Sequence, residues 1–276
     1  MTNRMTIRGL TIAIALSLAP SAAHATATLL DRGYREMYNL QFEEAHRTFE
    51  EYQRLNPSDP LGPVSDAAAY LFSEFDRLHI LQSEFFTHDP HFMTDHKLVP
   101  DPAVRRKFEA ALESSRALTK SSSGDDNATF ASILVFGLHS DYLALVDKRY
   151  GAAFQEMKTG RAMAESLLAR NPEYCDAWIA VGVENYMLSV KPAPLRLLLR
   201  LGGGQTDREL GLGKLRVTAA KGHFLAPFAR MLLAVAAMRD HDIALAHQLL
   251  AGLTAEFPQN PLYSQELARL DAGGSK

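Results

Sequence analysis

Apolar residues recur at three- and four-residue spacing through most of the chain after the first 25 residues, and runs with two-residue alternation are almost absent. Such spacing places the apolar side chains on one face of an α-helix. Ala45, Phe49 and Tyr52 form one face of this kind, and residues 246–253 repeat the pattern near the other end. The pattern predicts an all-α protein.

Helix-start and helix-stop residues divide this periodic chain into segments. Asp101 before Pro102 is typical of a helix start, as is Thr206 with Glu209 three residues later. Two segments interrupt the periodicity: 87–101, rich in His, Asp and Pro, and 191–205, which contains three successive glycines at 202–204. The predicted helices lie near residues 27–40, 42–55, 63–86, 102–120, 127–147, 150–170, 173–190, 206–221, 224–239, 242–256 and 260–271.

The first predicted hairpin carries small, aromatic and proline residues at the spacing of a helix-turn-helix repeat of about 34 residues. These residues are Gly33, Ala45, Phe49 and Pro57. The small residues allow two helices to approach closely, and the proline ends the second helix. This segment resembles a tetratricopeptide repeat.

A second match begins at Cys175, with Trp178 and Gly182 at the expected places, and a third ends at Pro258. The resemblance implies a right-handed solenoid of stacked antiparallel helix hairpins over residues 26–276, with degenerate central repeats. A weak domain boundary near residues 120–126 is the alternative to one continuous solenoid. The chain also resembles a set of exported bacterial repeat proteins, a likeness that implies architecture and no reaction. Its motifs here are Asp176-Ala177-Trp178, Pro194-Leu195-Arg196 and Glu209-Leu210-Gly211-Leu212.

The first 25 residues have the features of a secretory signal peptide. Arg4 and Arg8 precede an apolar run over residues 10–19, and Ala23-His24-Ala25 supplies small residues at the cleavage site. We expect cleavage after Ala25 and a periplasmic or secreted protein, with an uncleaved anchor as the alternative. No later segment is expected to be long and apolar enough to cross a membrane.

The charge of the chain bears on its partners. The formal net charge is −3, which argues against a dedicated nucleic-acid binder because such proteins carry a dense basic face. The single cysteine, Cys175, excludes an intramolecular disulfide and has no activating neighbour in sequence, so we interpret it as a packed residue.

Candidate chemistry is sparse. His88, His91 and His96, with acids between them, are metal-ligand types, but Pro90 and the irregular spacing favour a solvated loop. Residues 202–204 are three glycines without the Lys-Ser/Thr of a phosphate loop. No nucleophile motif appears. We therefore predict a non-enzyme without cofactor or metal, and a metal-dependent hydrolase built on the three histidines stays as a weak alternative.

Residues 195–201, Leu-Arg-Leu-Leu-Leu-Arg-Leu, are both apolar and basic. Such a stretch could lie on a membrane surface or fill a groove. A buried connecting helix whose two arginines extend to solvent is the interpretation that we favour, because seven residues bury too little area for lasting membrane attachment.

The resemblance implies that the first helix of each hairpin lines a concave surface, to which it assigns Tyr34, Met37 and Tyr186, with Glu184 and Asn185 as hydrogen-bonding neighbours. An apolar groove with tyrosines suits a helix or an extended peptide. We predict a non-catalytic cell-envelope scaffold that binds a protein or peptide partner. Two alternatives stay open: these side chains only pack against the next hairpin, or the protein binds a small molecule or lipid in a cavity beside residues 191–205.

Overall fold

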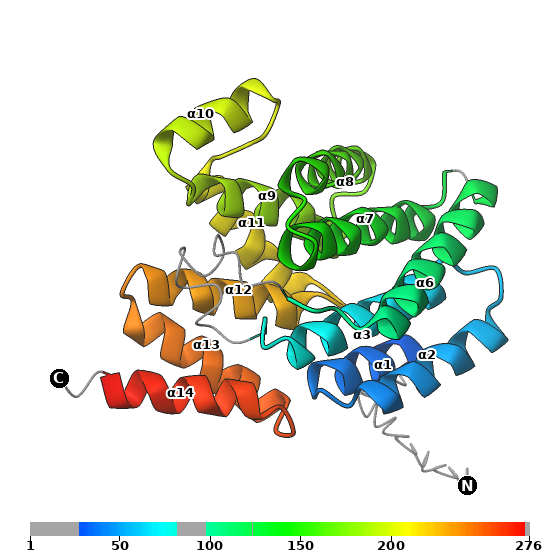
Figure 1. The fold of residues 1–276 in the computed structure, drawn as a ribbon, viewed down its shortest axis with the longest axis horizontal. Coiled ribbons are helices and arrows are strands. Elements are labelled where there is room, and N and C mark those ends of the chain that lie inside the picture. The colour runs from blue at the N-terminus through cyan, green and yellow to red at the C-terminus, as the bar shows by residue number, and fades with distance from the viewer. Residues whose placement is uncertain (1–27, 82–97, 123, 274–276) are drawn as a thin grey trace, which may run out of the picture.

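The computed structural model describes residues 28–81, 98–122 and 124–273. Within these ranges the chain forms twelve α-helices and two short helical turns, with no strand. Most helices pack against the next helix in the sequence (Figure 1). The all-α prediction is confirmed. The expected signal peptide, residues 1–25, and the three histidines His88, His91 and His96 lie outside the described residues.

The first half of the protein is a row of long helices joined by short connections. A π-helical turn, η1, continues the fifth of them without a break. The elements are α1 (Leu29–Tyr38), α2 (Phe42–Leu55), α3 (Leu61–Arg77), α6 (Pro102–Ser121), α7 (Asp126–Asp141), η1 (Tyr142–Val146) and α8 (Tyr150–Arg170).

The second half begins with a 3-10 turn, η2, that leads into α9. One short helix, α10, stands apart from the row (Figure 1). The elements are η2 (Cys175–Ala177), α9 (Trp178–Ser189), α10 (Ala193–Leu201), α11 (Arg208–Lys221), α12 (Ala226–Arg239), α13 (Ile243–Glu256) and α14 (Pro261–Gly273).

Helix starts follow local sequence chemistry. The Asp101 carboxylate accepts the backbone N–H of Ala103 at 2.7 Å ahead of α6, as predicted. The predicted capping box at Thr206 is wrong by one residue, because Asp207 accepts the N–H of Leu210 at 3.0 Å and begins α11. Helix α3 ends at Arg77 and not at 86.

Glycines set the closest helix pairs. A Cβ at Gly33 of α1 would lie 2.3 Å from Phe49 Cε1 of α2, and a Cβ at Gly211 of α11 would lie 2.6 Å from the backbone nitrogen of Tyr186 in α9. Side chains at these glycines would therefore force the helices apart. Helices α9 and α11 form a tight pair although residues 190–207 separate them, so α10 is an insertion within a helix hairpin.

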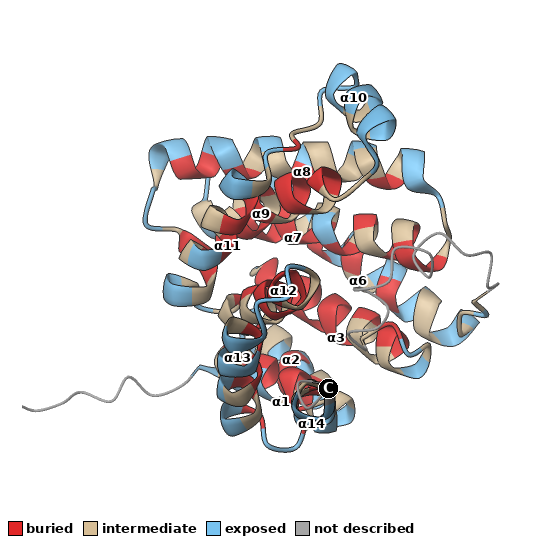
Figure 2. Ribbon diagram, turned by 90° about the vertical axis from the view of Figure 1, so that its left-hand side faces the viewer, coloured by how far each residue is buried: buried red, intermediate tan, exposed pale blue. Residues whose placement is uncertain are grey.

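The two ends of the helix row meet. The Asn260 side chain donates to the Tyr38 carbonyl at 2.9 Å, and the Tyr38 hydroxyl donates to the Phe224 carbonyl at 3.1 Å. The Tyr34 ring stacks on Phe224 with centroids 4.9 Å apart. In both views α1 and α2 lie at the same end of the molecule as α13 and α14 (Figures 1 and 2). The inner face of the row therefore becomes the interior of the protein.

Helix α7 is the central helix. Apolar residues cover all its faces, and it packs against α3, α6 and α8. Contrary to the sequence expectation, the continuous helix Asp126–Val146 is long and apolar enough to cross a membrane by length and composition. A core helix passes the same test, and 61% of the most apolar 18-residue window of this helix is buried inside the protein.

Candidate ligand cavity

The interior contains a large apolar cavity with two adjacent lobes. The outer lobe has a volume of about 380 Å³, and α3, η1, α8, α9, α10 and α12 line it with residues such as Phe154, Met187 and Leu199. The inner lobe, of about 90 Å³, lies between α1, α3, α7, α9 and α12. Five residues border both lobes: Phe72, Asp141, Met157, Val183 and Phe228. We call the two lobes together the central cavity.

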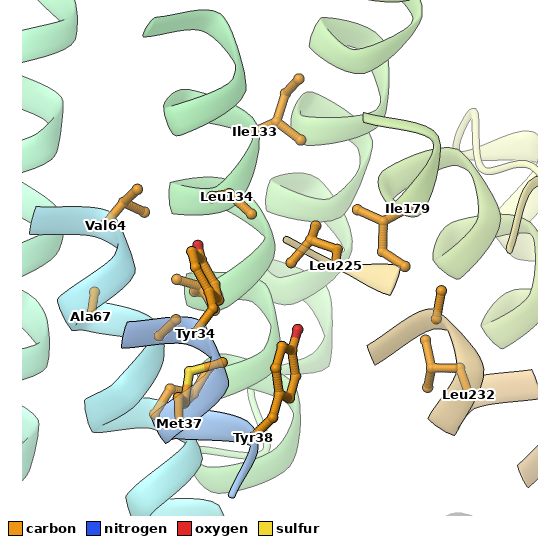
Figure 3. Close-up of a cluster of buried hydrophobic side chains, with 14 of the residues drawn as sticks. Tyr34, Met37, Tyr38, Val64, Ala67, Ile133, Leu134, Ile179, Leu225 and Leu232 are labelled. Atoms are coloured by element: carbon orange, nitrogen blue, oxygen red, sulfur yellow. The ribbon is translucent and has the colours of Figure 1, made fainter. Parts of the chain in front are cut away.

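Side chains from sequence-distant helices converge on the inner lobe (Figure 3). Tyr34 and Met37 of α1 face Ile133 of α7, Ile179 of α9 and Leu225 at the start of α12 across the interior. The hydrogen bonds between the chain ends hold α1 beside the entry to α12. The closure of the helix row thus supplies one wall of the cavity.

Small residues create the empty space. Gly137 of α7 is exposed where it borders the inner lobe, and a Cβ placed on it would meet no atom within 4 Å. Ala144 and Ala153 border the outer lobe. Protein interiors are close-packed, and pockets for small molecules hold roughly 300–1,000 Å³. The outer lobe, at about 380 Å³, lies within that range, which indicates a binding site more than a packing defect.

Helix α10 forms part of the outer wall. None of its residues is buried, which corrects the expectation of a buried connecting helix at residues 195–201. Leu195 and Leu199 line the outer lobe, whereas Leu197, Leu198 and Leu201 are 60%, 64% and 78% exposed. Figure 2 shows α10 projecting from the end opposite α13 and α14.

The connection that carries α10 is anchored by two residues that sequence reasoning assigned to the groove. Glu184 is fully buried and accepts the N–H of Gln205 and the Arg161 guanidinium, both at 2.9 Å. Burial raises the pKa of the Glu184 carboxyl, while these donors oppose the shift. Asn185 accepts the N–H of Asp207 at 3.0 Å. These bonds fix residues 205–207 against α9, leaving the helix itself lightly packed.

The three other predicted groove residues also lie inside the protein. Tyr34 is 4%, Met37 1% and Tyr186 2% exposed. Tyr34 and Met37 border the inner lobe, and Tyr186 lies at the tight contact between α9 and α11. Whether a partner binds at these residues stays a prediction.

Asp141 is a lining residue that sequence reasoning missed. It is the last residue of α7, at the change to the π-helical turn η1, a kind of turn found often at functional sites. Its carboxylate borders both lobes and has no hydrogen bond or ion pair within the described ranges. Burial raises its pKa to about 7. The only sequence signal was a lone acid inside the apolar stretch 130–146.

The other polar groups on the lining already have partners. Tyr34 accepts a hydrogen bond from Ser65 at 3.1 Å, Tyr38 donates to a carbonyl, and Ser140 donates to the Ala153 carbonyl at 3.0 Å. Tyr150 and Lys191, which face the outer lobe, also have interactions. Asp141 is therefore the polar group that the described chain leaves for a ligand.

Other groups of reactive side chains give less support for a functional site. His46 Nδ1 lies 2.5 Å from Asp66 Oδ1, and its ring stacks on Tyr70, but this pair borders neither lobe of the central cavity. Burial raises the pKa of the Cys175 thiol, which disfavours the reactive thiolate. Among the residues that the structure describes, no three His, Cys, Asp or Glu side chains gather as a metal site.

Comparison of the chain with models of protein families, with curated proteins and with solved structures gives no match.

Proposed function

We propose that this protein binds an apolar or amphiphilic small molecule in the central cavity. The observation that carries the proposal is the cavity itself, which is apolar, holds about 380 Å³ in its outer lobe and about 90 Å³ in its inner lobe, and is bordered by the inserted helix α10. Burial of apolar surface contributes about 25 cal/mol per Å², so a ligand that buries about 300 Å² gains roughly 7 kcal/mol before the costs of association. The cavity beside residues 191–205 thus becomes the leading hypothesis.

The scaffold hypothesis has less support than cavity binding. It requires a groove open to a peptide along Tyr34, Met37 and Tyr186, and all three side chains are buried within the chain. A partner that reached them would have to displace α12 or enter through the cavity. We therefore propose a small molecule as the guest, held without a chemical reaction.

The finer fold assignment is also a proposal. The contacts of Gly33 with Phe49 and of Gly182 with Leu215 support two units of the tetratricopeptide type, one of them interrupted by α10. Export to the periplasm rests on the expected signal peptide, residues 1–25. On these grounds we propose that the protein encounters its ligand in the cell envelope.

A second candidate function is transient docking of α10 on an anionic lipid surface, from which ligand would enter. Its support is the outward face of Leu197, Leu198 and Leu201, together with three basic residues and no acid over residues 190–206. On the same helix, Leu195 and Leu199 line the cavity. So short a helix favours weak, salt-sensitive attachment over lasting insertion.

Titration with N-phenyl-1-naphthylamine, whose fluorescence rises in apolar sites, tests the cavity proposal. We expect one saturable site in delipidated protein. Ala144→Phe places a ring in the outer lobe and should weaken binding at least about tenfold, equivalent to about 1.4 kcal/mol. Ala110→Phe on the exposed face of α6 is the matched control and should bind as the wild type does. Absence of saturable binding, or equal binding by Ala144→Phe, would overturn the proposal.

A further inference from the structure

Asp141 shares the lining of both lobes with aromatic residues. Phe72 of α3 and Phe228 of α12 border both lobes together with Asp141. Their rings meet edge to face, with centroids 5.8 Å apart. A carboxylate attracts a cation by charge, and aromatic faces attract it through the ring quadrupole. The combination is the chemistry that recognises ammonium groups.

We propose that Asp141, with Phe72 and Phe228, binds the ammonium group of a cationic amphiphile whose hydrocarbon chain occupies the outer lobe. This inference rests on the proposed function and adds the chemical class of ligand to it. The amphiphile's two parts match the two surfaces: a charged end for the shared wall of the lobes, and a chain for the apolar space that leads toward Leu195 and Leu199.

No other group on the lining supplies a free counter-charge. The remaining titratable side chains that face the lobes are Tyr34 and Tyr38 from α1, Tyr150 from α8, and Lys191 after α9. Helices α3, α10 and α12 contribute none. Burial holds the pKa of Tyr34 and Tyr38 well above the usual range, so both stay neutral at neutral pH. Lys191 has an interaction of its own. The uncompensated charge is therefore the negative charge of Asp141.

The Asp141 carboxylate and the two rings should discriminate among amphiphiles by the chemistry of their polar end. An ammonium group forms an ion pair with Asp141 and faces the rings, whereas an alcohol forms at most a neutral hydrogen bond, and a carboxylate is repelled. Because burial raises the pKa of Asp141 to about 7, the carboxyl is mainly neutral at pH 6 and mainly charged at pH 8. Affinity for an ammonium amphiphile should rise over that interval.

Matched ten-carbon amphiphiles test the proposal through displacement of N-phenyl-1-naphthylamine from the full chain at pH 8. We expect decylammonium to bind at least about tenfold more tightly than decanol, and decanoate most weakly. Asp141→Asn keeps the shape of the side chain but removes its charge. It should reduce the ammonium-to-alcohol ratio to within about threefold and abolish the rise from pH 6 to pH 8, with decanol affinity unchanged.

The outcomes separate this proposal from the proposed function. If wild type binds all three amphiphiles equally, or if Asp141→Asn keeps the preference, the Asp141 proposal is overturned and cavity binding stands. If neither the fluorescent probe nor any amphiphile binds, the proposed function fails as well. Thermal melting checks that Asp141→Asn folds. Should that variant not fold, Phe228→Leu retains the carboxylate and removes a ring, and it must still lower the ammonium-to-alcohol ratio.

Discussion

A large side chain at the edge of the inner lobe should stabilise the protein and block its ligand. Gly137 lies inside α7, where glycine is about 0.7 kcal/mol less favourable than leucine. Its added Cβ would meet no atom within 4 Å, and the residue borders the inner lobe. Gly137 is exposed where it borders the inner lobe, so the leucine side chain in Gly137→Leu would cover the edge of the lobe, bury part of its apolar surface and contribute up to about 1 kcal/mol. We expect the free energy of unfolding to rise by about 1–2 kcal/mol.

The magnitude is measurable by two assays on the same variant. For a chain of this size, 1 kcal/mol corresponds to a shift in Tm of about 2–4 °C, so the ligand-free variant should melt about 3–6 °C higher than the wild type. Binding of N-phenyl-1-naphthylamine should weaken at least about tenfold. Gly252→Leu in α13 is the matched control, because it also has no atom within 4 Å of the added Cβ and borders neither lobe.

The control separates helix propensity from cavity filling. Gly252→Leu should gain only about 0.5–1 kcal/mol and leave probe binding unchanged. Two results would refute the reasoning. A fall in Tm for Gly137→Leu would mean that the lobe is not empty, and unchanged probe affinity would mean that ligand does not use it.

Three further predictions follow from other contacts. Burial raises the pKa of Asp141 from 3.8 to about 7, so the folded state binds a proton more tightly than the unfolded state. The free energy of unfolding should therefore fall as the pH rises from about 4 to about 7. In urea unfolding, Asp141→Asn should be more stable than the wild type by about 2–4 kcal/mol at pH 8 and by little at pH 4. An equal gain at both pH values would contradict this account. Gly211→Val should cost about 2–4 kcal/mol of unfolding free energy, because its Cβ would lie 2.6 Å from the Tyr186 nitrogen. Gly213→Val, whose added Cβ meets no atom within 4 Å, should leave the free energy of unfolding unchanged or raise it slightly, because valine has a higher helix propensity than glycine. Similar losses in the two variants would contradict the packing argument. Serine substitutions at three exposed α10 positions should abolish sedimentation with anionic vesicles and leave probe binding intact; these positions are Leu197, Leu198 and Leu201. Continued sedimentation of this variant would exclude α10 as the docking helix.

Local sequence signals determined the helices. The three- and four-residue periodicity, Asp101 with Pro102, and the prolines after helix ends all act within a few residues of their effect. Gly33 opposite Phe49 was also readable, because the two helices that they join are adjacent in sequence. The misplaced start of α11 was an error between two adjacent cap-forming residues, Thr206 and Asp207.

Sequence reasoning named cavity-lining residues and kept a cavity beside residues 191–205 as an alternative, but it did not connect the two. Tyr34 and Met37 were singled out by their register on a helix, and the structure places both on the inner lobe. Periodicity predicts which face of a helix is apolar, but it does not distinguish a side chain packed against a neighbour from one that borders empty space. Asp141 was missed for a similar reason, since a lone acid in an apolar run gives no sign of what surrounds it.

The amino-acid sequence by itself determined the helical elements, their approximate ends and the close pairs marked by glycine, because these depend on interactions between residues near one another along the chain. Tertiary structure alone decided the cavity, the isolation of Asp141 and the exposure of α10. Each depends on where distant segments meet, as when Asn260 bonds to Tyr38 and brings the two ends of the row together. The volume left between packed helices is a property of all of them at once, so no single segment encodes it.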